Sequence, residues 1–194
     1  MNPKNPILPC ALLVVLSLAG VSVQAAEPPA SPSPESVVQS YAQALQSGRY
    51  LALAELMHPE ALEKFQSMML PLFDAAKGDD AAGLLALFRG VPDVAALKKL
   101  SRTEFFAAFF GGIIGGGEGV KEVLASVSMT PLGSVPEGDV LHFVCRSAVA
   151  TDGVSISKLE VVSLKRSAGS WRVLLSGEVE GVAQALRDAL SGKT

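Results

Sequence analysis

The side chains whose types and spacing could do chemistry lie on two expected strands and one expected helix. Lys158 and Glu160 are two positions apart in a stretch with strand-like alternation, so both point to one face. A hairpin turn at Asp152-Gly153 pairs Cys145 with Glu160 on that face, and Tyr41 of an N-terminal helix reaches the same interior. A carboxyl group held there beside a lysine and a phenol could bind a ligand or move a proton. The plainer alternative is an ion pair at the rim of the sheet, with Tyr41 only packing.

The Asp152-Gly153 turn fixes a register that separates apolar from polar side chains. The predicted partners are Thr151 with Val154, Cys145 with Glu160, and Phe143 with Val162. One face then collects Leu141, Phe143, Cys145, Val149, Ile156, Val162 and Leu164. The opposite face carries His142, Arg146, Ser155, Ser157 and Ser163, and His142 and Arg146 become candidate interface residues if that face binds a second copy.

These strands belong to a C-terminal half in which the apolar pattern has a period of two. Four antiparallel strands are expected at 123–134, 139–151, 154–165 and 170–176, followed by a helix over 179–190. Two amphipathic helices, 34–46 and 50–57, are expected near the N-terminus. Ser33 can cap the first, and Gly48 can end it in a left-handed conformation. The pattern predicts an α+β fold with N-terminal helices packed on a twisted sheet.

A helical insertion is expected between the two parts, over 60–119. Its helices are predicted at 60–69, with a kink or restart at Pro71, then at 79–88 and 93–100. A capping box, Ser101 with Glu104, opens a further helix that holds Phe105, Phe106, Phe109 and Phe110. These rings are either a buried core or, at Phe105 and Phe109, a surface for a partner or a membrane. The glycine-rich segment 111–119 is either a close-approach joint or a hinge.

The first residues predict export. Residues 1–26 combine Lys4, an apolar run and small residues before a cleavage point after Ala25 or Ala26, which is typical of a signal peptide. A Pro-rich tether follows at 27–34, and 35–194 has the length of one domain. No integral membrane segment is expected after cleavage. The mature chain would keep Cys145 alone, so no internal disulfide is expected, and its plainest role is that of a small buried residue.

Several chemistries are disfavoured by what the sequence lacks. His58 and His142 are the only histidines and have no metal-ligand spacing, so no metal is expected, and His58 before Pro59 suits a helix end. The glycine-rich segment lacks the lysine and serine or threonine of a phosphate-binding loop. The net charge of −3 and the absence of a Lys/Arg run argue against a nucleic-acid partner. No cofactor is predicted.

Two segments together resemble a known superfamily. The run from Val37 through Tyr41, Leu45 and Gly48 to His58-Pro59 is similar to the opening helices of the nuclear-transport-factor-two-like (cystatin-like) superfamily. The closing segments 161–165 and 171–175 resemble its last two strands. The resemblance covers about half of the mature chain and implies a cone of helices and sheet with an internal pocket. The helical insertion departs from the pattern of that superfamily.

Three functions follow as expectations. The first is a secreted or periplasmic, non-enzymatic module that binds a small apolar molecule or a protein, with Tyr41, Cys145, Lys158 and Glu160 as the pocket candidates. The second is an enzyme that uses a cavity acid such as Glu160 for proton transfer in an isomerase-, cyclase- or hydrolase-like reaction. The third is an assembly domain that forms a homodimer through the face around His142 and Arg146. Because no catalytic motif is present, we favour the non-enzymatic alternative and assign no catalytic residue.

Overall fold

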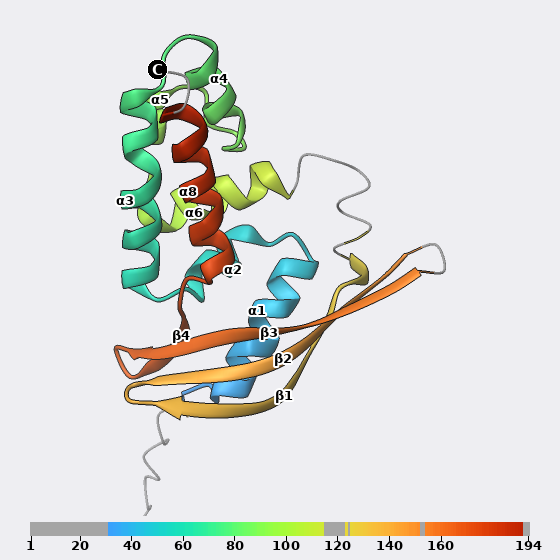
Figure 1. The fold of residues 1–194 in the computed structure, drawn as a ribbon. Coiled ribbons are helices and arrows are strands. Elements are labelled where there is room, and N and C mark those ends of the chain that lie inside the picture. The colour runs from blue at the N-terminus through green and yellow to red at the C-terminus, as the bar shows by residue number, and fades with distance from the viewer. Residues whose placement is uncertain (1–30, 115–122, 124, 152–153, 192–194) are drawn as a thin grey trace, which may run out of the picture. The chain divides into compact units, whose positions relative to one another are not determined.

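A computed structural model of the protein describes residues 31–114, 123, 125–151 and 154–191. Within this part the chain is α+β, with seven helices and one four-stranded antiparallel sheet, which confirms the predicted fold class. The helices gather on one side of the sheet (Figure 1). The signal segment, the first half of the tether, the Asp152-Gly153 turn and the end of the glycine-rich segment lie outside the described residues.

The first two helices follow the expected signals. Helix α1 spans Pro34–Gln46, and the Ser33 side chain accepts a hydrogen bond from the Ser36 amide at 3.2 Å. Gly48 has a φ of 63°, the left-handed conformation that ends α1. Helix α2 spans Tyr50–Glu55 and ends earlier than predicted. The reason is tertiary: Val173 donates to the Leu56 carbonyl at 2.9 Å, and His58 donates to the Val173 carbonyl at 2.7 Å, so the chain leaves α2 to pair with the last strand.

Of the predicted kink or restart at Pro71, the restart is wrong. Helix α3 spans Pro59–Ala75 and continues through Pro71. A proline inside a helix costs about 3 kcal/mol, because a hydrogen bond is lost and the ring crowds the preceding turn. The face of α3 that carries Leu62, Phe65, Met69, Leu72 and Phe73 is buried along its whole length, and this burial outweighs the local cost.

Three shorter elements complete the insertion. Helices α4 and α5 span Asp79–Ala86 and Val94–Leu97, and α6 spans Arg102–Ile113. The predicted capping box at the start of α6 is confirmed: Ser101 Oγ accepts from the Glu104 amide at 3.2 Å, and Glu104 Oε2 accepts from the Ser101 amide at 2.9 Å.

The sheet has the order β1-β2-β3-β4, with strands Ser128–Glu137, Val140–Thr151, Val154–Ser167 and Ser170–Val173. The predicted register of β2 and β3 is confirmed at all three of its test pairs, Thr151 with Val154, Cys145 with Glu160 and Phe143 with Val162. Ile156 is an exception to the buried pattern: its side chain is 66% exposed, because it lies close to the turn that joins β2 and β3.

The first strand differs from its prediction, which placed it over 123–134. Helical residues precede it at 125–126, and β1 continues to Glu137 through Pro131 and Pro136. Both prolines are tolerated because β1 is an edge strand, where an amide is not needed on the outer side. An irregularity in pairing between Pro131 and Gly133 also bends this edge.

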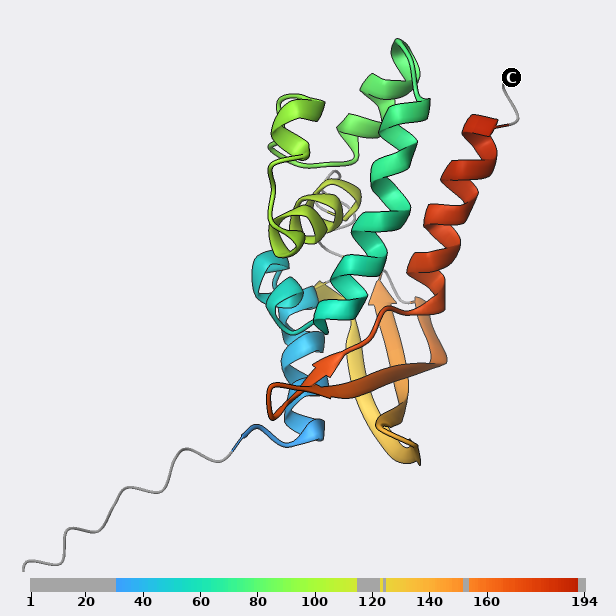
Figure 2. The ribbon, with the colours of Figure 1, turned by 90° about the vertical axis from the view of Figure 1, so that its left-hand side faces the viewer.

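Helix α8, Gly177–Ser191, follows the sheet and returns to the helical side. It lies alongside α3, as Figures 1 and 2 both show, and an ion pair of 2.6 Å joins Lys64 of α3 to Glu180 of α8. The end of α6 and the beginning of α8 therefore both lie above the inner face of the sheet, and this arrangement forms the walls of the site described below.

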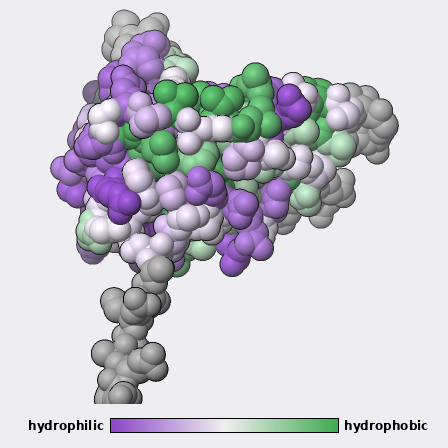
Figure 3. All heavy atoms as spheres, turned by 90° about the horizontal axis from the view of Figure 1, so that it is seen from below, coloured by the Kyte–Doolittle hydropathy of each residue, from purple (hydrophilic) through white to green (hydrophobic). Residues whose placement is uncertain are grey.

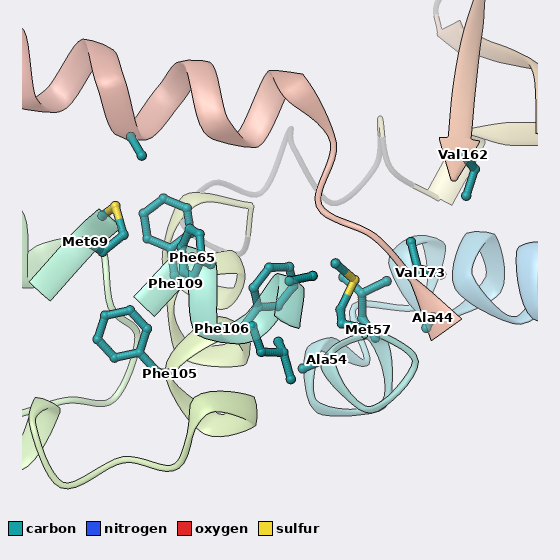
Figure 4. Packing of buried hydrophobic residues seen from close by; sticks show 14 of the residues in the cluster. Ala44, Ala54, Met57, Phe65, Met69, Phe105, Phe106, Phe109, Val162 and Val173 are labelled. Carbon is teal, nitrogen blue, oxygen red and sulfur yellow. The ribbon is translucent and has the colours of Figure 1, made fainter. Parts of the chain in front are cut away.

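Phenylalanine rings fill the interior of the helical half (Figure 4). Phe65 of α3 contacts the rings of Phe105, Phe106 and Phe109 of α6 at centroid distances of 5.9, 5.1 and 4.9 Å. Phe105 and Phe109 are 0% and 3% exposed, so neither can contact a partner, and the interface alternative for them is wrong. Each ring packs against other rings, so burial inside the fold stabilises the protein more than exposure of the rings to a partner would.

The beginning of the glycine-rich segment is a close-approach joint. A Cβ on Gly112 would lie 2.1 Å from the carbonyl oxygen and 2.5 Å from the carbonyl carbon of Leu87. Since no such contact is tolerated, only glycine lets α6 approach the backbone after α4. Of the two alternatives for this segment, the described Gly112 supports the joint.

Candidate functional site

A cavity of about 670 Å³ lies between the inner face of the sheet and three helices. Tyr41 and Leu45 of α1 form one wall, and Phe110 and Ile114 at the end of α6 form another. The floor comes from β1, β2 and β3, and the start of α8 closes a further side. The apolar lining of floor and helices consists of Leu45, Phe110, Ile114, Val127, Met129, Val149, Leu159, Val161, Val162 and Val179, and of these Leu159 and Val161 are also 63% and 55% exposed.

A polar cluster interrupts this apolar lining at one place. Ser147 Oγ donates a hydrogen bond to Glu160 Oε1, and Lys158 Nζ lies 3.3 Å from Glu160 Oε2. Lys158 also donates to Glu178 Oε1 at 3.0 Å. The strand period explains the first contacts, because Lys158 and Glu160 are two residues apart and Ser147 lies opposite Lys158 in the register. The Glu160 side chain is only 20% exposed, and Ser147 and Lys158 supply the polar contacts that such a side chain needs.

The electrostatics of the cluster appear in its neighbours. Burial, with the charges of Glu160 and Glu178, raises the pKa of Tyr41 to about 12, so this phenol stays protonated at neutral pH. The hydrogen bond to Glu178, together with Glu160, raises the pKa of the Lys158 ammonium against the opposing effect of burial. Tyr41 lines the cavity together with Glu160 and Glu178.

The structure brings three of the four pocket candidates together. Tyr41, Lys158 and Glu160 line one cavity, whereas Cys145 is 0% exposed and packs in the core beneath it. Burial and the nearby Glu160 raise the pKa of the Cys145 thiol. A thiol that is sealed from solvent and held protonated is a poor nucleophile, so Cys145 serves as a packing residue.

The sequence did not reveal Glu178. Its carboxylate shares Lys158 with Glu160, although it belongs to α8 and lies eighteen residues further along the chain. The only local signal was its position at the start of an expected helix, where acidic residues are common. The contact with Lys158 arises from the path of the chain between β4 and α8, which periodicity does not encode.

A second, more open groove of about 700 Å³ lies on another side of the molecule, between α2, α6 and the chain near Arg89. Two of its four charged lining residues have structural roles: Arg49 Nε donates to Ser47 Oγ at 2.9 Å, and Glu104 caps α6. Its floor is made of small residues such as Ala107 and Gly111. We therefore place the candidate site at the cavity around Glu160, where carboxylates and a phenol converge inside apolar walls.

The outer face of the sheet carries His142 and Arg146, as predicted from the register. His142 is held between Glu137 Oε2 at 2.9 Å and Ser163 Oγ at 2.8 Å. Arg146 is exposed and has no ion-pair partner among the described residues. Apolar side chains lie between these polar groups, and the view from below shows them as a continuous area over the sheet (Figure 3). Its exposed members are Leu132, Val135, Leu159 and Val161.

Comparisons with protein-family models, with curated proteins and with solved structures found no match for this chain. The superfamily resemblance therefore stays a prediction. Two searches of the described residues add to the picture of the site. No group of three or more His, Cys, Asp or Glu side chains there could hold a metal ion. None of the described helices has the length and apolar character of a membrane span.

Proposed function

We propose that the protein is an exported, non-enzymatic module that binds a small molecule in the cavity around Glu160. The observation that carries the proposal is an apolar cavity of about 670 Å³ with a single polar cluster on its wall. Ligand pockets of proteins have volumes of about 300–1,000 Å³ and combine apolar walls with a few convergent polar groups. Export rests on the signal-like residues 1–26.

Binding fits the cluster better than catalysis does. Lys158 contacts both Glu160 and Glu178, so neither carboxylate is free of a cation in the way a general base requires. The phenol of Tyr41 is held protonated, and Cys145 is closed to substrates. These groups can orient a polar part of a ligand by hydrogen bonds without a chemical step. A slow chemical change of the bound molecule would instead support the alternative function, an acid–base enzyme.

The decisive experiment is native mass spectrometry of the chain purified gently from its own compartment. We expect an added mass that disappears on denaturation. The variant Glu160→Gln keeps the shape of the side chain and removes its charge, so it should lose the added mass while remaining folded. Glu137→Gln on the outer face is the matched control and should keep it. A bare mass for the native chain, or equal retention by Glu160→Gln, would contradict the proposal.

A second candidate function is self-association through the outer face of the sheet. The specific observation is the apolar area there, in which Leu159 and Val161 are 63% and 55% exposed. Contiguous exposed apolar surface is typical of an interaction site. Sedimentation at rising concentration tests it: Val161→Lys should shift a dimer to monomer, and Leu51→Lys, at an exposed leucine of α2, should not. A native chain that stays monomeric at all concentrations would remove this function.

A further inference from the structure

The ligand cavity continues into a narrower, apolar cleft. A space of about 150 Å³ lies between the end of α6 and the first turns of α8. It shares Phe110, Ile114, Glu178 and Val179 with the larger cavity, so the two spaces adjoin at these residues. Its remaining lining is wholly apolar: Phe109, Ile113 and Val182. An occupant of both spaces would be long, with one polar end at the cluster and an apolar chain between the two helices.

The residues of the cleft fit such a chain. The side chains of Ile113 and Val182 line this apolar space, and each is 43% exposed. Val182 follows Glu178 by one helical turn, which places it about 6 Å further along α8. The apolar surface therefore begins directly beyond the carboxylate. A methylene chain that enters the cleft would cover Ile113 and Val182, and each methylene that is buried there favours binding.

The polar end of the cavity carries a net negative charge. Its only charged lining residues among those described are Lys158, Glu160 and Glu178, one cation against two anions. The three donor positions of Lys158 already serve two carboxylates, whereas an ionised carboxylate can accept about four hydrogen bonds. The cluster therefore has unused acceptors and few unused donors. Burial is the largest cause of the raised pKa of Tyr41, and the negative charges of Glu160 and Glu178 add to it.

From these observations we infer that the ligand is an amphiphile with an amine head: its ammonium group binds beside Lys158, at the acceptor positions of Glu160 and Glu178 that Lys158 and Ser147 leave free, and its alkyl chain lies in the cleft between α6 and α8. The inference rests on the proposed function, because it names the ligand class of the same cavity. A fatty acid of equal length would place its carboxylate beside two others and is disfavoured. A neutral alcohol can donate one hydrogen bond and ranks between the two.

A matched series of octylamine, octanol and octanoate tests the inference by titration calorimetry on the signal-free chain at neutral pH and low salt. The amine should bind at least about tenfold more tightly than the acid, a difference of about 1.4 kcal/mol. Added salt should reduce the difference, since part of the cluster is exposed. Equal affinities, or tighter binding of octanoate, would overturn the inference.

Two variants with controls localise the binding. Glu178→Gln should reduce the preference for the amine severalfold, whereas Glu180→Gln, two residues away and paired with Lys64, should leave it unchanged. If the amine were favoured only because the chain has a net charge of −3, both variants would reduce the preference for the amine equally. Val182→Ser should weaken all three probes together, and Val135→Ser on the outer face should not.

The outcomes separate the inference from the proposed function. If native mass spectrometry finds a retained ligand without an amine, and octylamine has no advantage, the cavity is a binding site and the amine head is wrong. If no probe binds and no ligand is retained, the proposed function itself fails. Binding of octylamine that ignores Glu178→Gln and Val182→Ser would place it outside this cavity and would also overturn the inference.

Discussion

The interior of the helical half and the interior between the helices and the sheet are built from the same kinds of residue but filled differently. Between α3 and α6, the ring centroids of Phe106 and Phe109 lie 5.1 and 4.9 Å from that of Phe65 (Figure 4). Above the sheet, Tyr41 and Glu160 border a cavity of about 670 Å³. The first region maximises contact, whereas the second gives up contacts and holds one largely buried carboxylate, that of Glu160.

This difference indicates a division of labour. Aromatic packing stabilises through area and through ring geometry, so the helical half can contribute most of the folding free energy. A cavity and a semi-buried carboxylate lower stability, and proteins retain such features where they serve a function. Variants in the two regions should therefore have opposite profiles: large effects on stability in one, and effects on binding in the other.

The largest effect is expected for Phe65→Ala. Phe65 is 1% exposed and contacts three other rings, so its loss leaves a cavity that rigid neighbours cannot fill. We expect the free energy of unfolding to fall by about 3–5 kcal/mol. Urea denaturation followed by circular dichroism measures it. A loss below about 1 kcal/mol would mean that the ring cluster is not the main source of stability.

The next effect is expected for Gly112→Ala. The new methyl group would meet the Leu87 carbonyl oxygen at 2.1 Å, so α6 must shift away from the chain after α4. The cost should be about 1–3 kcal/mol, as for other overpacked sites. Gly83→Ala in α4 is the control, because nothing lies within 4 Å of its Cβ, and it should stabilise by about 0.5–1 kcal/mol. The same thermal shift in both variants would contradict the close contact at Gly112.

A smaller effect concerns the pH dependence that Tyr41 contributes. Its pKa is raised from 10.0 to about 12, so below pH 10.0 the phenol is protonated in both states and its contribution is fully present. As the pH rises from 10.0 towards about 12, the unfolded chain loses the proton first and stability falls. Relative to Tyr41→Phe, the native chain should lose about 1–2 kcal/mol across this range. Parallel loss in both chains, measured by urea denaturation, would show that the Tyr41 hydroxyl is not shielded.

The smallest effect on stability is expected for Glu160→Gln. The substitution removes the charge of a side chain that is 20% exposed and leaves the acceptor for Ser147 in place. The free energy of unfolding should therefore change by less than about 1 kcal/mol. Ligand binding should nevertheless be lost. A fall as large as that for Phe65→Ala, measured in the same denaturation series, would mean that Glu160 is structural and would remove the contrast between the two regions.

Local rules located much of the fold. The caps at Ser33 and Ser101, the left-handed Gly48 and the register that pairs Cys145 with Glu160 were all predicted from residue type and spacing. Each depends on a few neighbouring residues or on a period of two or 3.6, so each is visible in the chain itself. The errors at the end of α2, at Pro71 and at the start of β1 have the opposite origin, since distant contacts outweigh local preference there.

The candidate site divides in the same way. That Lys158 and Glu160 share a face with Cys145 follows from local pattern, because strand alternation and the hairpin turn fix side-chain direction. Only the tertiary structure decided that Cys145 is sealed in the core, that Glu178 of α8 reaches Lys158, and that a cavity remains between the sheet and the ends of α6 and α8. Those outcomes depend on how whole elements pack at long range, where the free energy is shared among many contacts and no short pattern records it.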